Sequence, residues 1–514
     1  MKHRNFVCAV LVGLSVFAWS AMGQTPKSRA GQRPAPKSTP PARPAATPAQ
    51  KATATAPAPG TLAVVNGQTV TLADVDPKVR EVVEGFDANL PNLRRDALEA
   101  RVNTLLIENE AQKRKVSVEQ LMDAEVNNRI TDPTEAEVKA VYDANKQQIG
   151  DVDLATVRPQ IVGYLRSQAV QKRSSEFVTS LRSSHSVVMG TTDVNAPNLP
   201  QTAALATVDG RAITASEFEE RLKPFVYKLR REIYEAEARA IDMRVNQLLL
   251  EAEAKKRNLT AENVFKVEVA DKVHEPTEAE VTKFYADNKG RIQGDLASLR
   301  ADIANLLKNQ QLNRLEGEFA QRLRAAAALQ IYLPEPEPPV QSISTDDDPS
   351  RGEKNAPVTV VVFTDFQCPS CAATHPVLDE TLKAYGNRVR LVVRDFPLAM
   401  HPQARKAAEA ANAANAQGKF FEYIAVLFKN QSALDVASLK KYATDLGLDR
   451  TRFDTALDSG QYAAEVSNDV ADGEAYGVGG TPTIFINGVI LRNLTAEGIR
   501  TAIDRALASK TATR

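Results

Sequence analysis

The sequence predicts a multidomain chain of 514 residues, in which two mainly α-helical repeats precede a carboxy-terminal α/β domain with a helical insertion. Three observations support this fold class. Related segments recur at a constant spacing in the middle of the chain, strand-like and helix-like segments alternate from residue 353 onward, and proline-rich segments separate these parts. At roughly 150 residues per domain, the length allows about three domains.

The composition is that of an ordinary soluble globular protein. The chain has 64 basic and 64 acidic residues, 43% hydrophobic residues and a formal net charge of zero. A neutral chain offers no general attraction to a polyanion, so we expect no nucleic-acid partner.

Residues 1–23 predict an export signal. Basic residues precede a charge-free run over residues 6–21, and the small residues at 21–23 suit cleavage by a signal peptidase. The run is short for a membrane span, which needs about 20 apolar residues, although an uncleaved signal anchor is the alternative. We therefore expect the protein in the periplasm, either free or held by that anchor. Cys8 lies within the signal and would leave with it.

Residues 24–60 predict a disordered linker. They contain six positive charges, no acidic residue and almost no large apolar residue. Such a segment cannot form a core, and its prolines favour a semi-rigid extended tether. Contact with anionic polymers of the envelope is the alternative to a plain spacer.

The middle of the chain contains a duplication. Three pairs of segments are related at an offset of 143 residues: "LAVVNGQTVTLADV" (62–75) with "LATVDGRAITASEF" (205–218), "RVNTLLIENEAQKRKVS" (101–117) with "RVNQLLLEAEAKKRNLT" (244–260), and "PTEAEVKAVYDANK" (133–146) with "PTEAEVTKFYADNK" (276–289). A constant offset over such a length indicates two copies of one unit, which we place at residues 61–190 and 204–333.

Each copy reads as a short hairpin followed by long helices. Asn66-Gly67 and Asp209-Gly210 are turn pairs with a strong hairpin preference. Apolar residues three and four apart then predict helices, and the Thr-Glu-Ala-Glu strings at 134–137 and 277–280 predict capping boxes.

Each copy thus has a strand, a turn, long helices with "PTEAEV", and a closing helix that contains "FVTSLRSS" or "FAQRLRAA". This order resembles the amino-terminal chaperone domain of SurA and related parvulin foldases. In that family the helical part holds unfolded outer-membrane polypeptides, and a prolyl-isomerase domain is inserted near "YDANK". The connection that follows this motif is too short for such a domain in either copy. The resemblance therefore implies peptide binding without proline catalysis. Passive spacers or a dimerisation surface are the alternative.

Residues 334–352 predict a second linker. Alternating prolines and an acidic cluster indicate that this segment packs no core and isolates the last module.

The last module, 353–510, predicts a compact α/β domain. Its elements are expected as a buried strand at 358–363, a helix from Pro369 to about Tyr385, a second strand at 388–396, helical sequence over 401–475, a strand within "GGTPTIFING" and a final helix from Thr495. The order matches a thioredoxin fold with a helical insertion.

Cys368 and Cys371 fall where the first strand of this module leads into its helix. Unpaired backbone N–H groups and the helix dipole favour an anion at a helix start, so the pKa of Cys368 should be depressed. Pro369 costs nothing there, because its missing donor would have had no partner. Cys371, one turn further on and more buried, is the expected resolving thiol.

Three other roles for the cysteine pair are weaker. A structural disulfide closing so small a loop would stabilise the fold by only about 2 kcal/mol. A zinc site needs four ligands, and only His375 is a plausible third, so we expect no metal and no other cofactor. An inactive pair is the third alternative. A CxxC motif at a strand-to-helix junction of an exported protein favours redox chemistry over all three.

The module also resembles the DsbA-like thiol-disulfide oxidoreductases. The similarity lies in "FTDFQCPSC", "RDFPLAMHPQA", "AANAANAQGKFFEYIAVLF", "LGLD" and "GVGGTPTIFING". It implies that Cys368 exchanges with client cysteines through a mixed disulfide that Cys371 resolves. It also implies that Thr481 and Pro482 form the loop in which a cis-proline faces the cysteines and pairs with the client backbone.

The sequence departs from that family at two places. Ser370 stands between the cysteines where many members have histidine, so a cationic partner of the thiolate is missing. Val362 occupies the position of a buried acid that moves the proton of the resolving thiol. Asp365, His375 and His401 are interpreted as solvated or surface residues.

The sequence thus predicts an exported oxidoreductase for cysteines of envelope proteins. Its expected partners are unfolded or reduced envelope proteins and a membrane protein that oxidises or reduces the pair. The direction of electron flow depends on that partner and on a reduction potential, which the sequence does not fix. The alternative is a periplasmic holdase or interaction protein in which the thioredoxin-like domain is accessory.

Overall fold

The computed structural model describes residues 58–512, apart from residues 151, 290–293 and 346. The predicted signal at 1–23 and nearly all of the predicted tether at 24–60 therefore lie outside the described residues. Within the described ranges, no helix is both long enough and apolar enough to cross a membrane.

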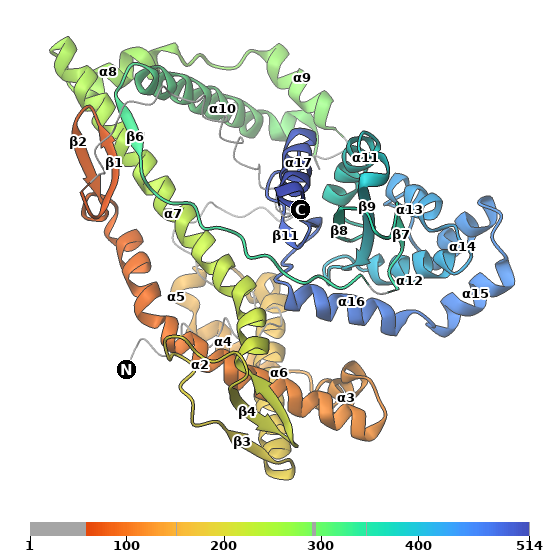
Figure 1. Ribbon diagram of the computed structural model, residues 1–514. Helices are drawn as coiled ribbons and strands as arrows, with labels where there is room; N and C mark the ends of the chain where they lie inside the picture. The colour runs from red at the N-terminus through yellow and green to blue at the C-terminus, as the bar shows by residue number, and fades with distance from the viewer. Residues whose placement is uncertain (1–57, 151, 290–293, 346, 513–514) are drawn as a thin grey trace. The chain divides into compact units, whose positions relative to one another are not determined.

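The two sequence copies have the same order of elements, as the duplication predicts, except that the short helix α5 of the first copy has no counterpart among the described residues of the second (Figure 1). The first copy contains β1 (Thr61–Val65), β2 (Gln68–Thr71), α2 (Pro77–Arg114), α3 (Val118–Glu125), α4 (Glu135–Ala144), α5 (Lys146–Ile149), α6 (Leu154–Ser184) and β3 (Val187–Met189). The second contains β4 (Ala204–Val208), β5 (Arg211–Thr214), α7 (Ala215–Arg257), α8 (Ala261–Glu268), α9 (Glu278–Asn288), α10 (Leu296–Ala325) and β6 (Leu329–Ile331).

The hairpin turns and helix caps of both copies form where the sequence predicts them. Asn66 and Asp209 have φ values of 49° and 50°, and the following glycines have 84° and 85°, so both hairpins turn through two left-handed residues. Thr134 and Thr277 each cap a helix and close a capping box with the glutamate three residues later. These features are local, which is why the sequence reveals them.

The last strand of each copy, which we call its closing strand, pairs with the hairpin of the other copy. Hairpin β1–β2 of the first copy pairs with β6 of the second copy, whereas hairpin β4–β5 of the second copy pairs with β3 of the first. The compact units consequently differ from the predicted repeats at 61–190 and 204–333. One unit combines residues 90–228 with 337–514, and the described part of the other combines 58–89 with 229–336.

This exchange makes the sheet of each copy depend on a strand of the other copy. A two-stranded hairpin is marginal in water, and a third strand stabilises it. In the second unit, the buried faces of β1 and β2 pack against α7, with Val65 and Val70 contacting a cluster that includes Ile241, Val245 and Leu249. A single copy would therefore lack the strand that completes its sheet.

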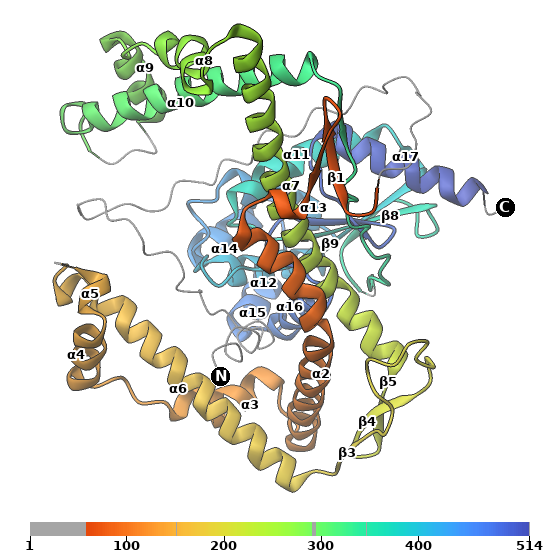
Figure 2. The same cartoon turned by 90° about the vertical axis from the view of Figure 1, so that its left-hand side faces the viewer.

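The carboxy-terminal domain has the predicted alternation of strands and helices (Figures 1 and 2). Its elements are β7 (Ser350–Arg351), β8 (Val358–Thr364), α11 (Pro369–Lys383), β9 (Val389–Asp395), α12 (Ala404–Asn415), α13 (Phe420–Lys429), α14 (Val436–Asp445), α15 (Arg450–Ser459), α16 (Ala463–Ala475), β10 (Thr483–Ile486), β11 (Val489–Ile490) and α17 (Ala496–Ala512).

The five-stranded sheet of this domain has the order β11-β10-β8-β9-β7. Strands β8 and β9 are parallel, and β10 is antiparallel to β8. Alternate residues of β8 face opposite sides: Val360 and Val362 pack in the core with α11, the helical insertion and α17, whereas Val361 and Phe363 pack in a second cluster with Tyr476. The sheet is therefore covered on both faces.

The predicted linker at 334–352 is wrong in its later part. Strand β7 pairs with β9, Gln341 N–H donates to Gly488 O at 2.9 Å, and Ile343 packs against the second cluster. Asp348 is buried beside the Arg394 guanidinium, with Asp348 Oδ2 3.0 Å from Arg394 Nε. The acidic residues looked solvated in the sequence, but Asp348 is drawn inside because the buried arginine needs a counter-ion.

Candidate redox site

Cys368 lies at the start of α11, as predicted. Its backbone is extended, with φ −75° and ψ 122°, and it forms the N-cap, while Pro369 opens the helix. Cys371 follows in the first turn, and both thiols are free. Cys368 is 6% exposed and Cys371 is 2% exposed, so the predicted order of exposure holds, although both are buried.

The two thiols have opposite tendencies to ionise. A hydrogen bond from the Cys371 thiol, assisted by Thr481 and by the backbone N–H groups of Cys371 and Ser370, outweighs burial and lowers the pKa of Cys368 to about 5. The hydrogen bond to Cys368 and burial raise the pKa of Cys371 far above its usual value, despite hydrogen bonds from the Thr364 hydroxyl and the Asp365 N–H. Cys368 is thus a thiolate at neutral pH, and Cys371 keeps its proton.

Thr481 and Pro482 lie against this pair. Their peptide bond is cis, as the resemblance implied. Sγ of Cys368 lies 3.5 Å from Thr481 O, and Pro482 lines a pocket together with Cys371. Strand β10 begins at the next residue, and its pairing of Thr483 with Phe363 holds the loop beside the end of β8. The four residues predicted from distant parts of the sequence are therefore neighbours.

Pro369 and Ser370 are exposed at the helix start. The sequence suggested that the Ser370 hydroxyl could donate to the thiolate. In the structure it is the backbone N–H of Ser370 that helps to lower the pKa of Cys368. Any residue except proline would supply this N–H group.

The interpretation of Asp365 and His401 as solvated is wrong. Asp365 is 1% exposed. Its carboxylate accepts hydrogen bonds from Gln367 N–H at 2.7 Å, from Leu398 N–H at 2.8 Å and from His401 Nδ1 at 2.7 Å. The loop before Cys368 turns inward and joins the loop after β9 through this carboxylate, which a local reading of the sequence does not show.

His375 is not a surface residue either. It lines the pocket beside Cys371, its ring meets Phe428 edge-on at 4.9 Å, and its Nδ1 lies 3.4 Å from Asp379 Oδ2. Burial lowers the pKa of this imidazole. Val362, where the family has an acid, lines the same pocket as an apolar side chain.

Gln431 is a positioning residue that the sequence analysis missed. Its Nε2 donates to Phe366 O at 3.0 Å and to Cys368 O at 2.8 Å, so it fixes the backbone at the redox pair. The glutamine is 63 residues from Cys368 in the chain, and nothing in the local sequence marks it.

One group of carboxylates in the described part of the chain has metal-like spacing. Oxygens of Asp348, Glu465 and Asp469 lie within 4.8 Å of one another. The Arg394 guanidinium already occupies this cluster, because its Nε lies 3.0 Å from Asp348 Oδ2 and its Nη2 donates to Asp469 Oδ1. An arginine side chain thus already pairs with two of the three carboxylates.

Comparisons with known proteins agree with this site. Residues 344–505 match the model of a family described as thioredoxin. Over 147 residues, or 28% of this chain, the sequence is 43% identical to the Na(+)/H(+) antiporter NhaA 3 of Salinispora tropica, and the match covers 22% of that antiporter. Because the chain covers so little of the antiporter, the transport named there is not carried over.

Two solved structures illustrate the similarity. BdbD from Bacillus subtilis is 23% identical, with a TM-score of 0.31 and coverage of 34% of this chain and 96% of BdbD. A thioredoxin-like oxidoreductase from Silicibacter pomeroyi is 26% identical, with a TM-score of 0.29 and coverage of 31% of this chain and 92% of that protein.

The predicted fold class is thus confirmed at the coarser level of a multidomain, mostly helical chain with a carboxy-terminal α/β domain. The carboxy-terminal part of the chain, over residues 344–505, is a thioredoxin-like domain.

Proposed function

We propose that this chain is an exported protein thiol-disulfide oxidoreductase that acts on cysteines of envelope proteins through Cys368 and Cys371. The observation that carries the proposal is that the two thiols have opposite tendencies to ionise. Cys368 is stabilised as a thiolate at a helix start, and Cys371 beneath it holds its proton. Such a pair suits a nucleophile and a resolving thiol.

The exchange proceeds in two balanced steps. In the oxidising direction, a client thiolate attacks Cys368 of the disulfide form, the Cys368–Cys371 bond breaks, and Cys371 leaves with the electron pair and takes up a proton. A second client thiolate then attacks the client sulfur of the mixed disulfide and releases Cys368. The client loses two electrons and the cysteine pair gains them. The reverse sequence reduces a client disulfide.

The loop at Thr481 and Pro482 supplies the client contact nearest the reacting sulfur. Thr481 O lies 3.5 Å from Cys368 Sγ. A client chain lying along this loop would bring its cysteine next to Cys368. We propose that a membrane thiol-oxidising or thiol-reducing protein recycles the pair, and that its potential sets the direction of electron flow.

We further propose that the helical repeats, which resemble the SurA chaperone domain, hold unfolded clients for the redox pair. A client held on the same chain can reach an effective concentration in the millimolar range, on the order of that given by short flexible linkers. A periplasmic location, which this proposal requires, is suggested by residues 1–23. The alternative is a holdase in which the redox domain is accessory.

Replacing the nucleophile separates these two functions. Cys368→Ser should abolish disulfide exchange with reduced polypeptides and leave suppression of client aggregation intact. Cys371→Ala should accumulate mixed disulfides, because Cys368 still attacks but nothing resolves the product. These species are measured by non-reducing electrophoresis after acid trapping. Full exchange activity in Cys368→Ser would contradict the proposal, and a matched Ser370→Ala variant should behave like the wild type.

Removing the repeats tests their role with clients. Because the copies exchange strands, both must be removed together, as residues 61–333. The shortened chain should keep its activity on short cysteine peptides and lose rate on long reduced polypeptides through weaker binding. Unchanged turnover of long clients would show that the repeats are spacers.

The residue between the cysteines should tune the potential. With Ser370 and no cationic neighbour, the disulfide should be harder to reduce than that of DsbA, whose potential is about −120 mV. Ser370→His should raise the potential, measured by equilibration with glutathione. No shift in the variant would contradict the role assigned to this position.

A further inference from the structure

A small pocket lies behind the redox pair in the carboxy-terminal domain. Helix α11, strands β8 and β9, helix α13 and Pro482 line it, and Cys371 forms part of its wall. Most lining side chains are apolar. The polar groups among them come from Thr364, Thr374, His375 and Asp379, in addition to Cys371.

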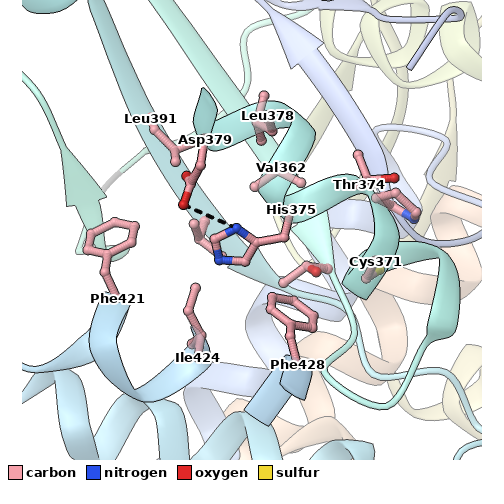
Figure 3. A pocket seen from close by; sticks show the side chains of 13 residues that line it. Val362, Cys371, Thr374, His375, Leu378, Asp379, Leu391, Phe421, Ile424 and Phe428 are labelled. Atoms are coloured by element: carbon pink, nitrogen blue, oxygen red, sulfur yellow. Dashed lines mark ion pairs between the residues drawn. The ribbon is translucent and has the colours of Figure 1, made fainter. Parts of the chain in front are cut away.

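His375 is held in this pocket with one ring nitrogen unused. Nδ1 lies 3.4 Å from Asp379 Oδ2, whereas Nε2 is buried and has no hydrogen-bond partner among the described residues. Figure 3 shows the ring projecting from α11 toward the side chains of α13, with Asp379 on one side and Cys371 one turn earlier on the same helix. If Nδ1 carries the hydrogen that faces Asp379, Nε2 is an acceptor.

The charged surroundings of the ring are sparse. On its own helix it faces Asp379 and Cys371, and Arg351 of β7 pairs with Asp379 at 2.5 Å. Strands β8 and β9 and helix α13 contribute only apolar or hydroxyl side chains to the pocket. Among the described residues that line it, His375 is thus the group whose ordinary titration range is nearest to neutral pH.

Resolution of a mixed disulfide requires a proton acceptor for Cys371. The thiolate, not the thiol, attacks the Cys368 sulfur. Cys371 is 2% exposed, and its burial, which does not depend on a thiolate at Cys368, raises its pKa. The Thr364 hydroxyl hydrogen-bonds to the Cys371 sulfur and lines the pocket that His375 also lines. Residues four apart on a helix lie on one face, which places Cys371 and His375 side by side.

We propose that His375 is the proton acceptor that serves Cys371, with the proton passing through the pocket by way of the Thr364 hydroxyl or solvent; this rests on the proposed function. In the resolving step, Cys371 loses its proton to His375 Nε2, the thiolate attacks Cys368 Sγ, the Cys368–Cys371 bond forms, and the client sulfur leaves with the electron pair of the broken bond. In the opposite direction, imidazolium at His375 returns the proton to Cys371 as it leaves. Atoms and electrons balance in both directions.

The test uses the reduced full-length protein and an aromatic disulfide that releases a coloured thiolate. Attack by Cys368 releases the first thiolate, and attack by Cys371 on the resulting mixed disulfide releases the second, so the two phases report the two cysteines separately. His375→Gln should slow the second phase about 10²-fold, a typical contribution of a general base, and leave the first phase unchanged. His375→Asn is the matched variant, because it can still hydrogen-bond to Asp379 but cannot accept the proton.

The pH dependence distinguishes proton transfer from structural support. In the wild type, the second phase should slow as the pH falls through the imidazole pKa, which lies below its ordinary 6.5. Both variants should lose this inflection. Normal second-phase kinetics in His375→Gln, or full recovery in His375→Asn, would overturn the inference. A wild-type protein that shows no second phase would instead contradict the proposed oxidoreductase function itself.

Discussion

The two junctions at which the repeats exchange strands have the same backbone geometry. At the β3–β4 junction, Asp209 N–H donates to Ser186 O at 2.8 Å, and Ser186 N–H donates to Asp209 Oδ1 at 3.0 Å. At the β6–β1 junction, Asn66 N–H donates to Ala328 O at 2.8 Å, and Ala328 N–H donates to Asn66 Oδ1 at 3.0 Å. Both junctions therefore share one backbone hydrogen bond and one hydrogen bond to a side-chain oxygen.

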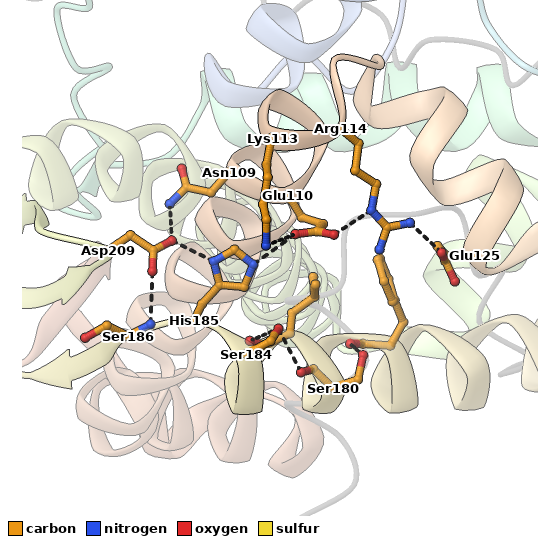
Figure 4. Close-up of polar contacts among 12 residues, drawn as sticks. Asn109, Glu110, Lys113, Arg114, Glu125, Ser180, Ser184, His185, Ser186 and Asp209 are labelled. Carbon is orange, nitrogen blue, oxygen red and sulfur yellow. Dashed lines mark hydrogen bonds and ion pairs between the residues drawn. The ribbon is translucent and has the colours of Figure 1, made fainter.

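The side chains around the junctions differ. His185 is 5% exposed at the β3–β4 junction, with Nδ1 2.7 Å from Asp209 Oδ2 and Nε2 3.2 Å from Glu110 Oε2 (Figure 4). Ala327 holds the corresponding place at the other junction, between "RLRAA" and Ala328. One junction thus carries an ionic cluster, and the other does not.

Glu110 and its counterpart Glu253 show the same difference. Burial tends to raise the pKa of Glu110, but hydrogen bonds from Arg114 and His185 outweigh it and lower the pKa. A hydrogen bond from Arg257 lowers the pKa of Glu253. The arginine four residues later is common to both copies, whereas the histidine is not. The difference between the junctions therefore centres on one imidazole.

Of the changes considered, His185→Ala should lower the stability of its sheet most, because it makes the β3–β4 junction resemble the β6–β1 junction. It leaves a small cavity and removes a partner from two carboxylates, so the opening free energy of β3 and β4 should fall by about 2 kcal/mol. Hydrogen exchange of the amides in these strands measures it. Amides of β1 and β6 serve as the internal control. Equal protection before and after the change would show that the cluster is not stabilising.

The hairpin turns and helix caps of both copies were predictable from sequence because each depends on residues a few positions apart. The exchange was not. Hairpins β1–β2 and β4–β5 are related in sequence, and each pairs with its closing strand along the same edge, so the local sequence does not tell which closing strand completes which sheet. Only the path of the long helices decides between the two, and no local pattern encodes it.

At the redox site, too, some features were predictable from the sequence and others were not. Cys368 and Cys371 lie at the strand-to-helix junction that the CxxC motif and the strand order predict, and the cis peptide bond at Thr481–Pro482 agrees with what the resemblance to the DsbA-like family implied. The burial of Asp365 and His375 was missed, because whether a polar side chain next to the strand or on the helix faces solvent depends on the loop after β9 and on α13. No local pattern in the sequence indicates these tertiary contacts.

Removing each glutamate should have a smaller effect than removing the histidine. Glu110→Gln loses the ion pairs with Arg114 and Lys113 and the contact with His185, whereas Glu253→Gln loses the ion pairs with Arg257 and Lys256. We expect a loss of about 1–2 kcal/mol at the first junction and less at the second, because one additional buried contact is broken. Hydrogen exchange in the two three-stranded sheets provides the comparison. A larger effect for Glu253→Gln would contradict the view that the imidazole distinguishes them.

Asp209→Asn should cost less again, roughly 1 kcal/mol or below, since asparagine is what the other junction uses. The amide oxygen can still accept from Ser186 N–H, as Asn66 Oδ1 does from Ala328 N–H. The charge facing His185 is lost, together with the oxygen that accepts from Asn109 Nδ2 at 3.0 Å. In a protein that already carries His185→Ala, Asp209→Asn should cause almost no further loss of opening free energy. A double-mutant cycle on the amides of β3 and β4 would measure this. An additive result would mean that the two side chains act independently.

The smallest expected difference is in the acid response of the two sheets. The hydrogen bond from His185, followed by that from Asn109, lowers the pKa of Asp209, and Glu110 also has a lowered pKa. A carboxylate with a lowered pKa stabilises the fold above its unfolded-state value, and this contribution is lost as the pH falls through that value and the folded one. The β3–β4 junction has two such groups, whereas the β6–β1 junction has only Glu253, because Asn66 does not ionise. Below the ordinary glutamate value of 4.5, protection of the β3–β4 amides should therefore fall more steeply than protection of the β1–β6 amides. Hydrogen exchange, corrected for its intrinsic pH dependence, measures how steeply the protection of both sets of amides falls with pH in one sample. Asp209→Asn should make the two pH dependences more similar. Parallel slopes in the wild-type protein would show that the ionic cluster adds no acid sensitivity to the exchange.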